Sequence, residues 1–137
     1  MTALVVLHIC QQTTATEFLV NESVQAALPL KPADYFILFV LLDGERHGYW
    51  MAKEIERISE GQVRLEAGNL YRSLRRMMKS GWVERSDWRP ALDSDDERRR
   101  YYGITELGTM IVRAEVERMR AVVATAEAHS VVRSDGR

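Results

Sequence analysis

The chain has 137 residues, a formal net charge of −1, 46% hydrophobic residues and 28% charged residues. That length suits one domain with a single hydrophobic core, and the balance of apolar and charged residues excludes global disorder. Because Cys10 is the lone cysteine and no apolar run reaches the roughly 18 residues that span a bilayer, we expect a cytoplasmic protein without a disulfide, a secretory signal or a membrane segment.

Residues 1–28 are an N-terminal extension in which no pattern indicates a specific chemistry. Thr14 and Glu17 have the spacing of a capping box, which predicts a helix that begins at Thr14. Pro29 and Pro32 separate this segment from the rest of the chain. We therefore expect the extension to be a helical arm that assists dimerisation, with partial disorder as the alternative.

Two further helices are predicted over Pro32–Leu42 and from His47 or Gly48 to Ile58. Proline suits the first turn of the earlier helix, and Asp34 complements the positive end of its dipole. That helix is apolar on nearly all sides, which is typical of a helix buried within a domain or between two subunits.

A third helix is predicted after the short alternating segment Gln62–Leu65, which has the pattern of a strand. Asn69 is its expected N-cap, and Gly81 is expected to end it. Its outer face has four basic residues and no acid: Arg72, Arg75, Arg76 and Lys79. On a chain of net charge −1, this segregation indicates one positive surface.

The remainder of the chain predicts a hairpin and a long helix. Trp82–Trp88 and Arg99–Ile104 are the expected strands, separated by a polar loop that contains Asp93, Asp95, Asp96 and Glu97. Thr105 is expected to cap a final helix that extends to about His129.

The order of these elements is that of a winged helix, so the expected fold class is mostly α with a small β-hairpin. We expect a winged helix-turn-helix domain over residues 29–104 and a long C-terminal dimerisation helix over 105–129. Residues 130–137 are expected to be a tail.

The last helix has an apolar stripe that is too broad for a small domain to cover. A second copy of the chain is the simplest partner, because symmetric dimers are the commonest oligomers. Two charge pairs, Glu115 with Arg118 and Arg113 with Glu117, are expected to lie on the surface. The predicted dimer interface consists of Leu107, Ile111, Ala114, Met119, Val122, Val123 and Ala126.

The third helix is the candidate recognition helix. Lysine and arginine neutralise DNA phosphates, while side chains on a helix in the major groove reach base edges. The simpler alternatives are a basic surface helix without a ligand, and wing arginines that only neutralise the acidic loop. The predicted contacts to double-stranded DNA are Asn69, Tyr71, Arg72, Ser73, Arg75, Arg76, Lys79, Arg98 and Arg99.

Four blocks of sequence occur in a characteristic order. They are His47-Gly48-Tyr49 with Glu54-Ile55, Gly68-Asn69-Leu70-Tyr71-Arg72-Ser73-Leu74, Gly81-Trp82-Val83, and Arg99-Arg100-Tyr101-Tyr102 followed by Ile104-Thr105-Glu106-Leu107-Gly108. Over about Leu30 to His129 the chain thus resembles the PadR family of transcription regulators. The chain departs from the family at Asn69, where threonine is usual, and near Lys31, where a capping serine or threonine is usual.

This resemblance implies a homodimeric repressor that binds a pseudo-palindromic operator and responds to a small aromatic effector. His47 has no paired carboxylate or nucleophile, so a role as a helix cap is favoured over catalysis. His8 and Cys10 are too few to form a metal site. We expect no enzyme activity, metal or cofactor. Two alternatives are a winged-helix protein-interaction module and a small-molecule-binding dimer that does not bind DNA.

Overall fold

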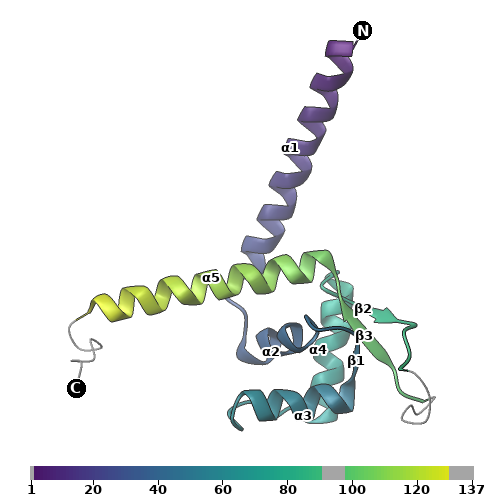
Figure 1. The fold of residues 1–137 in the computed structure, drawn as a ribbon, viewed down its shortest axis with the longest axis vertical. Coiled ribbons are helices and arrows are strands. Elements are labelled where there is room, and N and C mark those ends of the chain that lie inside the picture. The colour runs from purple at the N-terminus through teal and green to yellow at the C-terminus, as the bar shows by residue number, and fades with distance from the viewer. Residues whose placement is uncertain (1, 91–97, 130–137) are drawn as a thin grey trace.

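The computed structural model describes residues 2–90 and 98–129, with side chains from residue 15 onward within those ranges. The elements in chain order are α1 (Thr2–Ala27), α2 (Pro32–Val40), β1 (Arg46–His47), α3 (Gly48–Ile58), α4 (Ala67–Lys79), β2 (Val83–Ser86), β3 (Tyr101–Ile104) and α5 (Glu106–Ala128). The predicted fold class, mostly helical with a small antiparallel sheet, is confirmed. We call residues 32–104 the head; α5 lies across it, and α1 extends away from both (Figure 1).

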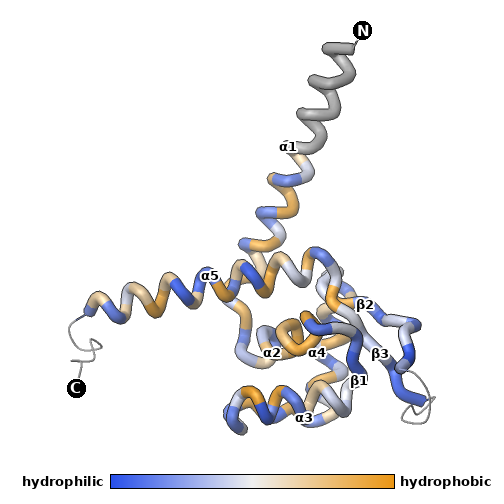
Figure 2. Tube along the Cα trace, viewed as in Figure 1, coloured by the Kyte–Doolittle hydropathy of each residue, from blue (hydrophilic) through white to orange (hydrophobic). Residues whose placement is uncertain are grey.

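One hydrophobic core holds the head against the first half of α5. The apolar α2 supplies its centre, as its hydropathy indicates (Figure 2), and α3, α4, β2 and α5 each add one apolar face. Its fully buried side chains are Ile37, Leu38, Leu41, Met51, Ile55, Leu70, Leu74, Met77, Val83, Ile111 and Val112. Leu70, Leu74 and Met77 thus form the inner face of α4.

The sheet has three strands in the order β1-β3-β2, and both pairings are antiparallel. The prediction of a strand at Gln62–Leu65 is wrong, and Arg46–His47 is the third strand instead. The Ser59 hydroxyl accepts a hydrogen bond from the Val63 backbone N–H at 3.0 Å, so that segment is held to the end of α3. The free edge of β3 is therefore available to β1, which pairs His47 with Tyr101.

Two helix starts follow from side-chain hydrogen bonds, and the start of a third helix differs from its prediction. His47 Nδ1 accepts from the Trp50 N–H at 3.2 Å, which confirms the histidine as the cap of α3. Thr105 Oγ1 accepts from the Gly108 N–H at 3.1 Å, as predicted for α5. The prediction for Asn69 is wrong, because α4 begins two residues earlier with Glu66 at the N-cap position. Asn69 lies in the first turn with its side chain exposed.

The first helix begins at Thr2 rather than at Thr14. No glycine or proline interrupts the chain between these residues, so nothing in the sequence ends the helix before the capping box. Its 26 residues correspond to a length of about 39 Å. Near its C-terminal end it packs on α5, where Val20 and Val24 approach Met110, whereas Phe18 and Leu19 are exposed.

The prediction that Glu115 and Arg118 form an ordinary surface pair is wrong. Glu115 is only 1% exposed, and its two carboxylate oxygens have different partners. Oε2 accepts from the backbone N–H of Leu30 at 2.5 Å, and Oε1 accepts from Arg118 Nε at 2.6 Å. Leu30 belongs to the connection between α1 and α2, so this carboxylate joins that connection to the middle of α5.

The second predicted surface pair, Arg113 with Glu117, also differs in the structure. Glu117 forms its ion pair with Arg120 Nη1 at 2.6 Å, and both side chains are exposed. The two glutamates lie two residues apart on α5, and the helical period turns them to nearly opposite sides, so they have very different environments.

We expect Glu115→Gln to lower the free energy of unfolding by about 1–3 kcal/mol, the cost of a buried hydrogen-bonding group left without its partner. Leu30 and Arg118 both donate, and an amide has only one oxygen to accept. Urea denaturation of the variant and the parent measures the loss. Glu117→Gln is the matched control and should change stability by less than about 0.5 kcal/mol, because its ion pair is exposed. Equal effects of the two substitutions would contradict a special role for Glu115.

Candidate nucleic-acid interface

The outer face of α4 presents the predicted contact residues away from the core. Leu70, Leu74 and Met77 point into the core, so the helical period turns the intervening residues outward. Ser73 is half-buried, and the others on this helix are exposed: Asn69, Tyr71, Arg72, Arg75, Arg76 and Lys79. Except for Ser73, these residues are positioned to meet a partner.

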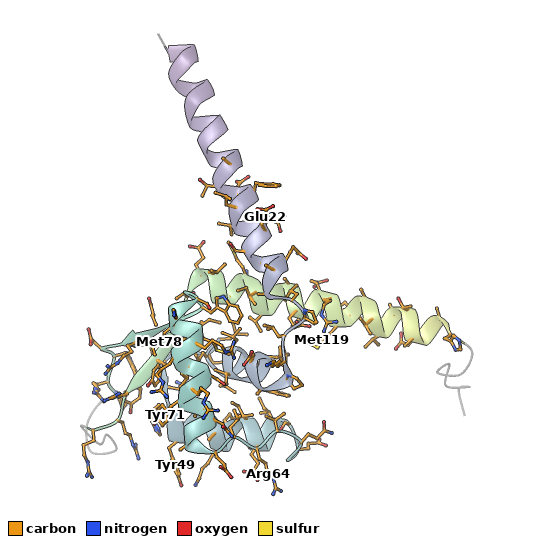
Figure 3. The ribbon with its side chains drawn as sticks, turned by 180° about the vertical axis from the view of Figure 1, so that it is seen from behind. Glu22, Tyr49, Arg64, Tyr71, Met78 and Met119 are labelled. Atoms are coloured by element: carbon orange, nitrogen blue, oxygen red, sulfur yellow. The ribbon has the colours of Figure 1, made fainter. Side chains whose placement is uncertain are left out.

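Tyr71 is held against the start of α3. A Cβ atom placed on Gly48 would lie 2.8 Å from the Tyr71 hydroxyl oxygen, so the ring fits only because position 48 has no side chain. Burial raises the pKa of Tyr102, and the neighbouring Tyr71 raises it further, which places the two phenols close together. The close approach at Gly48 thus fixes the Tyr71 ring at the exposed surface of α4. Figure 3 labels Tyr71 on α4 and Tyr49 at the start of α3.

A cleft of about 560 Å³ lies between α4, the start of α3 and the strands of the wing. No described residue that lines it is acidic. Its lining residues are His47, Gly48, Tyr49, Tyr71, Arg75, Met78, Arg85, Arg98, Arg99, Arg100 and Tyr102. Five guanidinium groups and three phenol rings at one cleft form a surface that suits a polyanion with exposed ring faces.

At the wing, the side chains of Trp88 and Arg89 pack against the Tyr101 ring. The Arg89 guanidinium lies 5.1 Å from the centre of the Tyr101 ring and donates to the Arg99 backbone carbonyl at 2.5 Å. Trp88 packs edge-on against the same ring, with 5.4 Å between ring centres. Arg98 is exposed and Arg99 is half-buried. The acidic loop predicted to neutralise these arginines, residues 93–97, lies outside the described residues.

Arg76 differs from its neighbours because it has a partner within the head. Its Nη2 donates to Asp34 Oδ1 at 2.7 Å, and the Asp34 side chain is 7% exposed while that of Arg76 is 50% exposed. Asp34 therefore does more than complement the dipole of α2, since it ties α2 to α4. Of the predicted phosphate contacts on α4, Arg76 is the one already engaged in a buried ion pair.

Two arginines of the cleft, Arg85 and Arg100, were absent from the predicted contacts. Arg100 continues the basic run of Arg98 and Arg99, so the run itself was a sufficient signal. Arg85 follows Glu84, and this adjacent acid hides its contribution in a count of local charge. Its place opposite Tyr102 in the β2–β3 register brings it to the cleft.

The comparison with protein families gives one match. Residues 37–114 match the model of the transcriptional regulator PadR-like family, which is more than half of the chain. The match covers the core helices, the cleft and the first part of α5. No curated protein matches the sequence.

Several solved structures have a similar fold. A transcriptional regulator from Clostridium thermocellum aligns with a TM-score of 0.57 and 23% identity, over 72% of this chain and 89% of that chain. A PadR family transcription regulator from Clostridium difficile aligns with a TM-score of 0.58 and 21% identity, over 71% and 96%. RosR from H. salinarum aligns with a TM-score of 0.53 and 25% identity, over 78% and 86%.

Within residues 2–90 and 98–129, no helix is both long enough and apolar enough to cross a membrane.

We expect Arg76→Ala to lower the free energy of unfolding by about 1–3 kcal/mol, because the substitution leaves the buried Asp34 carboxylate without its charged donor. Arg75→Ala, one residue earlier on the same helix, should change stability by less than about 0.5 kcal/mol. Thermal or urea denaturation of the two variants side by side measures both effects. Indistinguishable stabilities would mean that the Asp34–Arg76 ion pair contributes nothing to the head.

Proposed function

Since the chain belongs to the PadR-like family of transcriptional regulators, we propose that it binds specific sequences of double-stranded DNA as a homodimer. In this proposal α4 lies in the major groove and the wing lies beside the adjacent backbone. The observation that carries it is the cleft between α4 and the wing, where Arg75, Arg85 and Arg98–Arg100 meet and no described lining residue is acidic.

The chemistry of this surface divides between affinity and specificity. The arginines neutralise phosphates and supply affinity that does not depend on sequence. Asn69 and Tyr71, near the N-terminal end of α4, have the short or rigid polar groups that reach base edges. A protein-interaction module would not need five arginines around one cleft, and this argument favours DNA over that alternative.

The homodimer is supported by apolar side chains that the single chain leaves uncovered. Val122 and Val123 on the second half of α5 are 54% and 53% exposed, and Met119 and Ala126 share their helical stripe. Ile111 is fully buried in the core of its own chain, and Leu107 and Ala114 pack against that core. We therefore place the interface on Met119, Val122, Val123 and Ala126 and leave the three earlier residues out of it.

The N-terminal helix offers a second uncovered apolar surface. Phe18 and Leu19 are exposed, although α1 packs on α5 only a turn further along. Figure 3 shows Met119 on α5, on the far side of the head from Tyr49. A dimer formed through α5 with help from α1 would thus leave the DNA-binding surface of each head free.

Two finer parts of the proposal rest on family membership alone. We propose that the dimer occupies a pseudo-palindromic operator as a repressor, since a two-fold dimer matches two half-sites about one helical turn apart. We also propose that a small aromatic effector relieves this repression. Selecting bound duplexes from a random DNA pool tests the core of the proposal, and recovery of no enriched sequence would favour one of the alternatives.

We expect Arg75→Ala to weaken binding to every duplex tested and to reduce the slope of log K against log[salt] by about one unit, the change expected for one lost phosphate contact. Fluorescence anisotropy at several salt concentrations measures both quantities. Arg113→Ala, an exposed arginine of α5, is the matched control and should leave affinity and slope unchanged. An Arg75→Ala variant that binds like the parent at every salt concentration would remove α4 from the interface.

We expect Val123→Asp to raise the dissociation constant of the dimer by roughly 100-fold or more, because burying an unpaired carboxylate costs several kcal/mol and each 1.4 kcal/mol is tenfold. Sedimentation velocity over a range of concentrations measures the shift to monomer. Gln62→Asp adds the same charge at an exposed position in the head and should remain dimeric. A Val123→Asp protein that stays dimeric at low concentration would place the interface elsewhere.

A further inference from the structure

Glu115 lies at the boundary between two functionally different halves of α5. On its N-terminal side, Ile111 and Val112 are buried in the core that includes the head. On its C-terminal side, Val122 and Val123 are exposed and belong to the proposed dimer interface. Glu115 therefore lies close to the place where the head packs on α5, and contacts near it limit changes in the angle between the two.

The carboxylate connects α5 to the segment that leads into the head. Oε2 accepts from the Leu30 N–H in the connection between α1 and α2, and Oε1 accepts from Arg118, which lies on α5 itself. Arg118 therefore orients the carboxylate, and Leu30 is the contact that reaches beyond α5. Burial raises the pKa of Tyr35 on α2, and the negative charge of Glu115 raises it further.

The separation of two recognition helices in a dimer depends on how each head is held on its dimerising helix. Half-sites that suit a two-fold dimer are spaced by one turn of DNA, 10–10.5 base pairs, so each inserted base pair rotates one half-site by about 34°. A dimer with a stiff joint between head and α5 tolerates little of this rotation, whereas a dimer with a loose joint tolerates more.

We infer that Glu115 is a positioning residue for DNA recognition: by accepting a hydrogen bond from the Leu30 N–H, it fixes on α5 the connection that leads into the head and so determines which operator half-site spacing the dimer accepts. This inference rests on the proposed function, since it requires the DNA-binding homodimer. It assigns Glu115 no contact with DNA.

The first arm of the test measures the joint without DNA. A nitroxide label on Gln62→Cys, an exposed position in the head, is used in the full-length chain with Cys10→Ala, and pulsed dipolar spectroscopy gives the distance distribution between the two heads of a dimer. We expect a narrow distribution for the parent and a clearly broader one for Glu115→Gln. Arg118→Gln, which removes the other partner at a half-exposed position, should broaden it as well.

Loss of stability alone must not be mistaken for loss of positioning. Ile55→Val in the core of α3 lowers stability without touching the joint, because Ile55 is buried at a site where the expected cost is about 0.5–1.5 kcal/mol. This variant should retain the narrow distribution. If it broadens like Glu115→Gln, or if both joint variants remain as narrow as the parent, the inference is overturned.

The second arm uses the selected operator, its single half-site, and versions with one or two base pairs inserted between half-sites. The parent should lose about 100-fold in affinity when the insertion prevents both heads from binding together, whereas Glu115→Gln should lose less than about tenfold. Affinity for the single half-site should be the same for both proteins. Equal sensitivity to spacing would overturn the inference.

Failure of the proposed function gives a different pattern. If the parent shows no distance between heads, the dimer is absent and the inference falls with it. If the parent forms a dimer but no duplex is bound, DNA recognition is wrong and with it the role assigned to Glu115 in spacing. A third pattern separates the two ideas. If the protein is a dimer that binds DNA, but Glu115→Gln and Arg118→Gln behave like the parent or Ile55→Val broadens like Glu115→Gln, the inference is overturned and the proposed function stands.

Discussion

The architecture depends on how a carboxylate is satisfied in the middle of α5. Glu115 is almost fully buried, and an unpaired charge in such a place would cost several kcal/mol. Its two oxygens meet a backbone N–H of the α1–α2 connection and the guanidinium of Arg118. Because the Leu30 N–H belongs to the connection that joins α1 to α2, satisfying the charge requires this connection to lie beside the middle of α5. A hydrophobic contact, which has no direction, would specify this arrangement less strictly.

The head achieves a positive surface in a chain whose net charge is −1 by using its ion pairs selectively. Arg76 is held by Asp34, and Arg57 is held by Glu54 on α3. Five arginines converge on the cleft, and none of the described residues that line the cleft is acidic. At the wing, the Arg89 guanidinium lies over the Tyr101 ring. Charge is thus segregated by structure rather than by composition.

Much of this could be predicted from sequence, because local rules dominate in α3, α4 and α5. The cap at Thr105, the cap at His47 and the apolar stripe of α4 follow from spacing alone. Long-range partners could not be predicted. Glu115 and Arg118 have the spacing of a surface pair, and nothing near them shows that Leu30, 85 residues away in sequence, donates to the same carboxylate. Likewise β1 exists because β3 has a free edge, a property that residues 46–47 do not reveal.

The fit between Tyr71 and Gly48 also constrains how related sequences can diverge. The phenol occupies the volume that a Cβ at position 48 would need, so any larger residue at position 48 requires the Tyr71 ring to move. In a lineage that first acquired alanine at position 48, the new methyl group would displace the Tyr71 ring, which belongs to the proposed DNA-binding surface. Shortening position 71 first would remove that obstacle, although the ring would be lost at once. The order of mutations is therefore restricted, and positions 48 and 71 should covary among descendants that keep the same proposed DNA-binding surface.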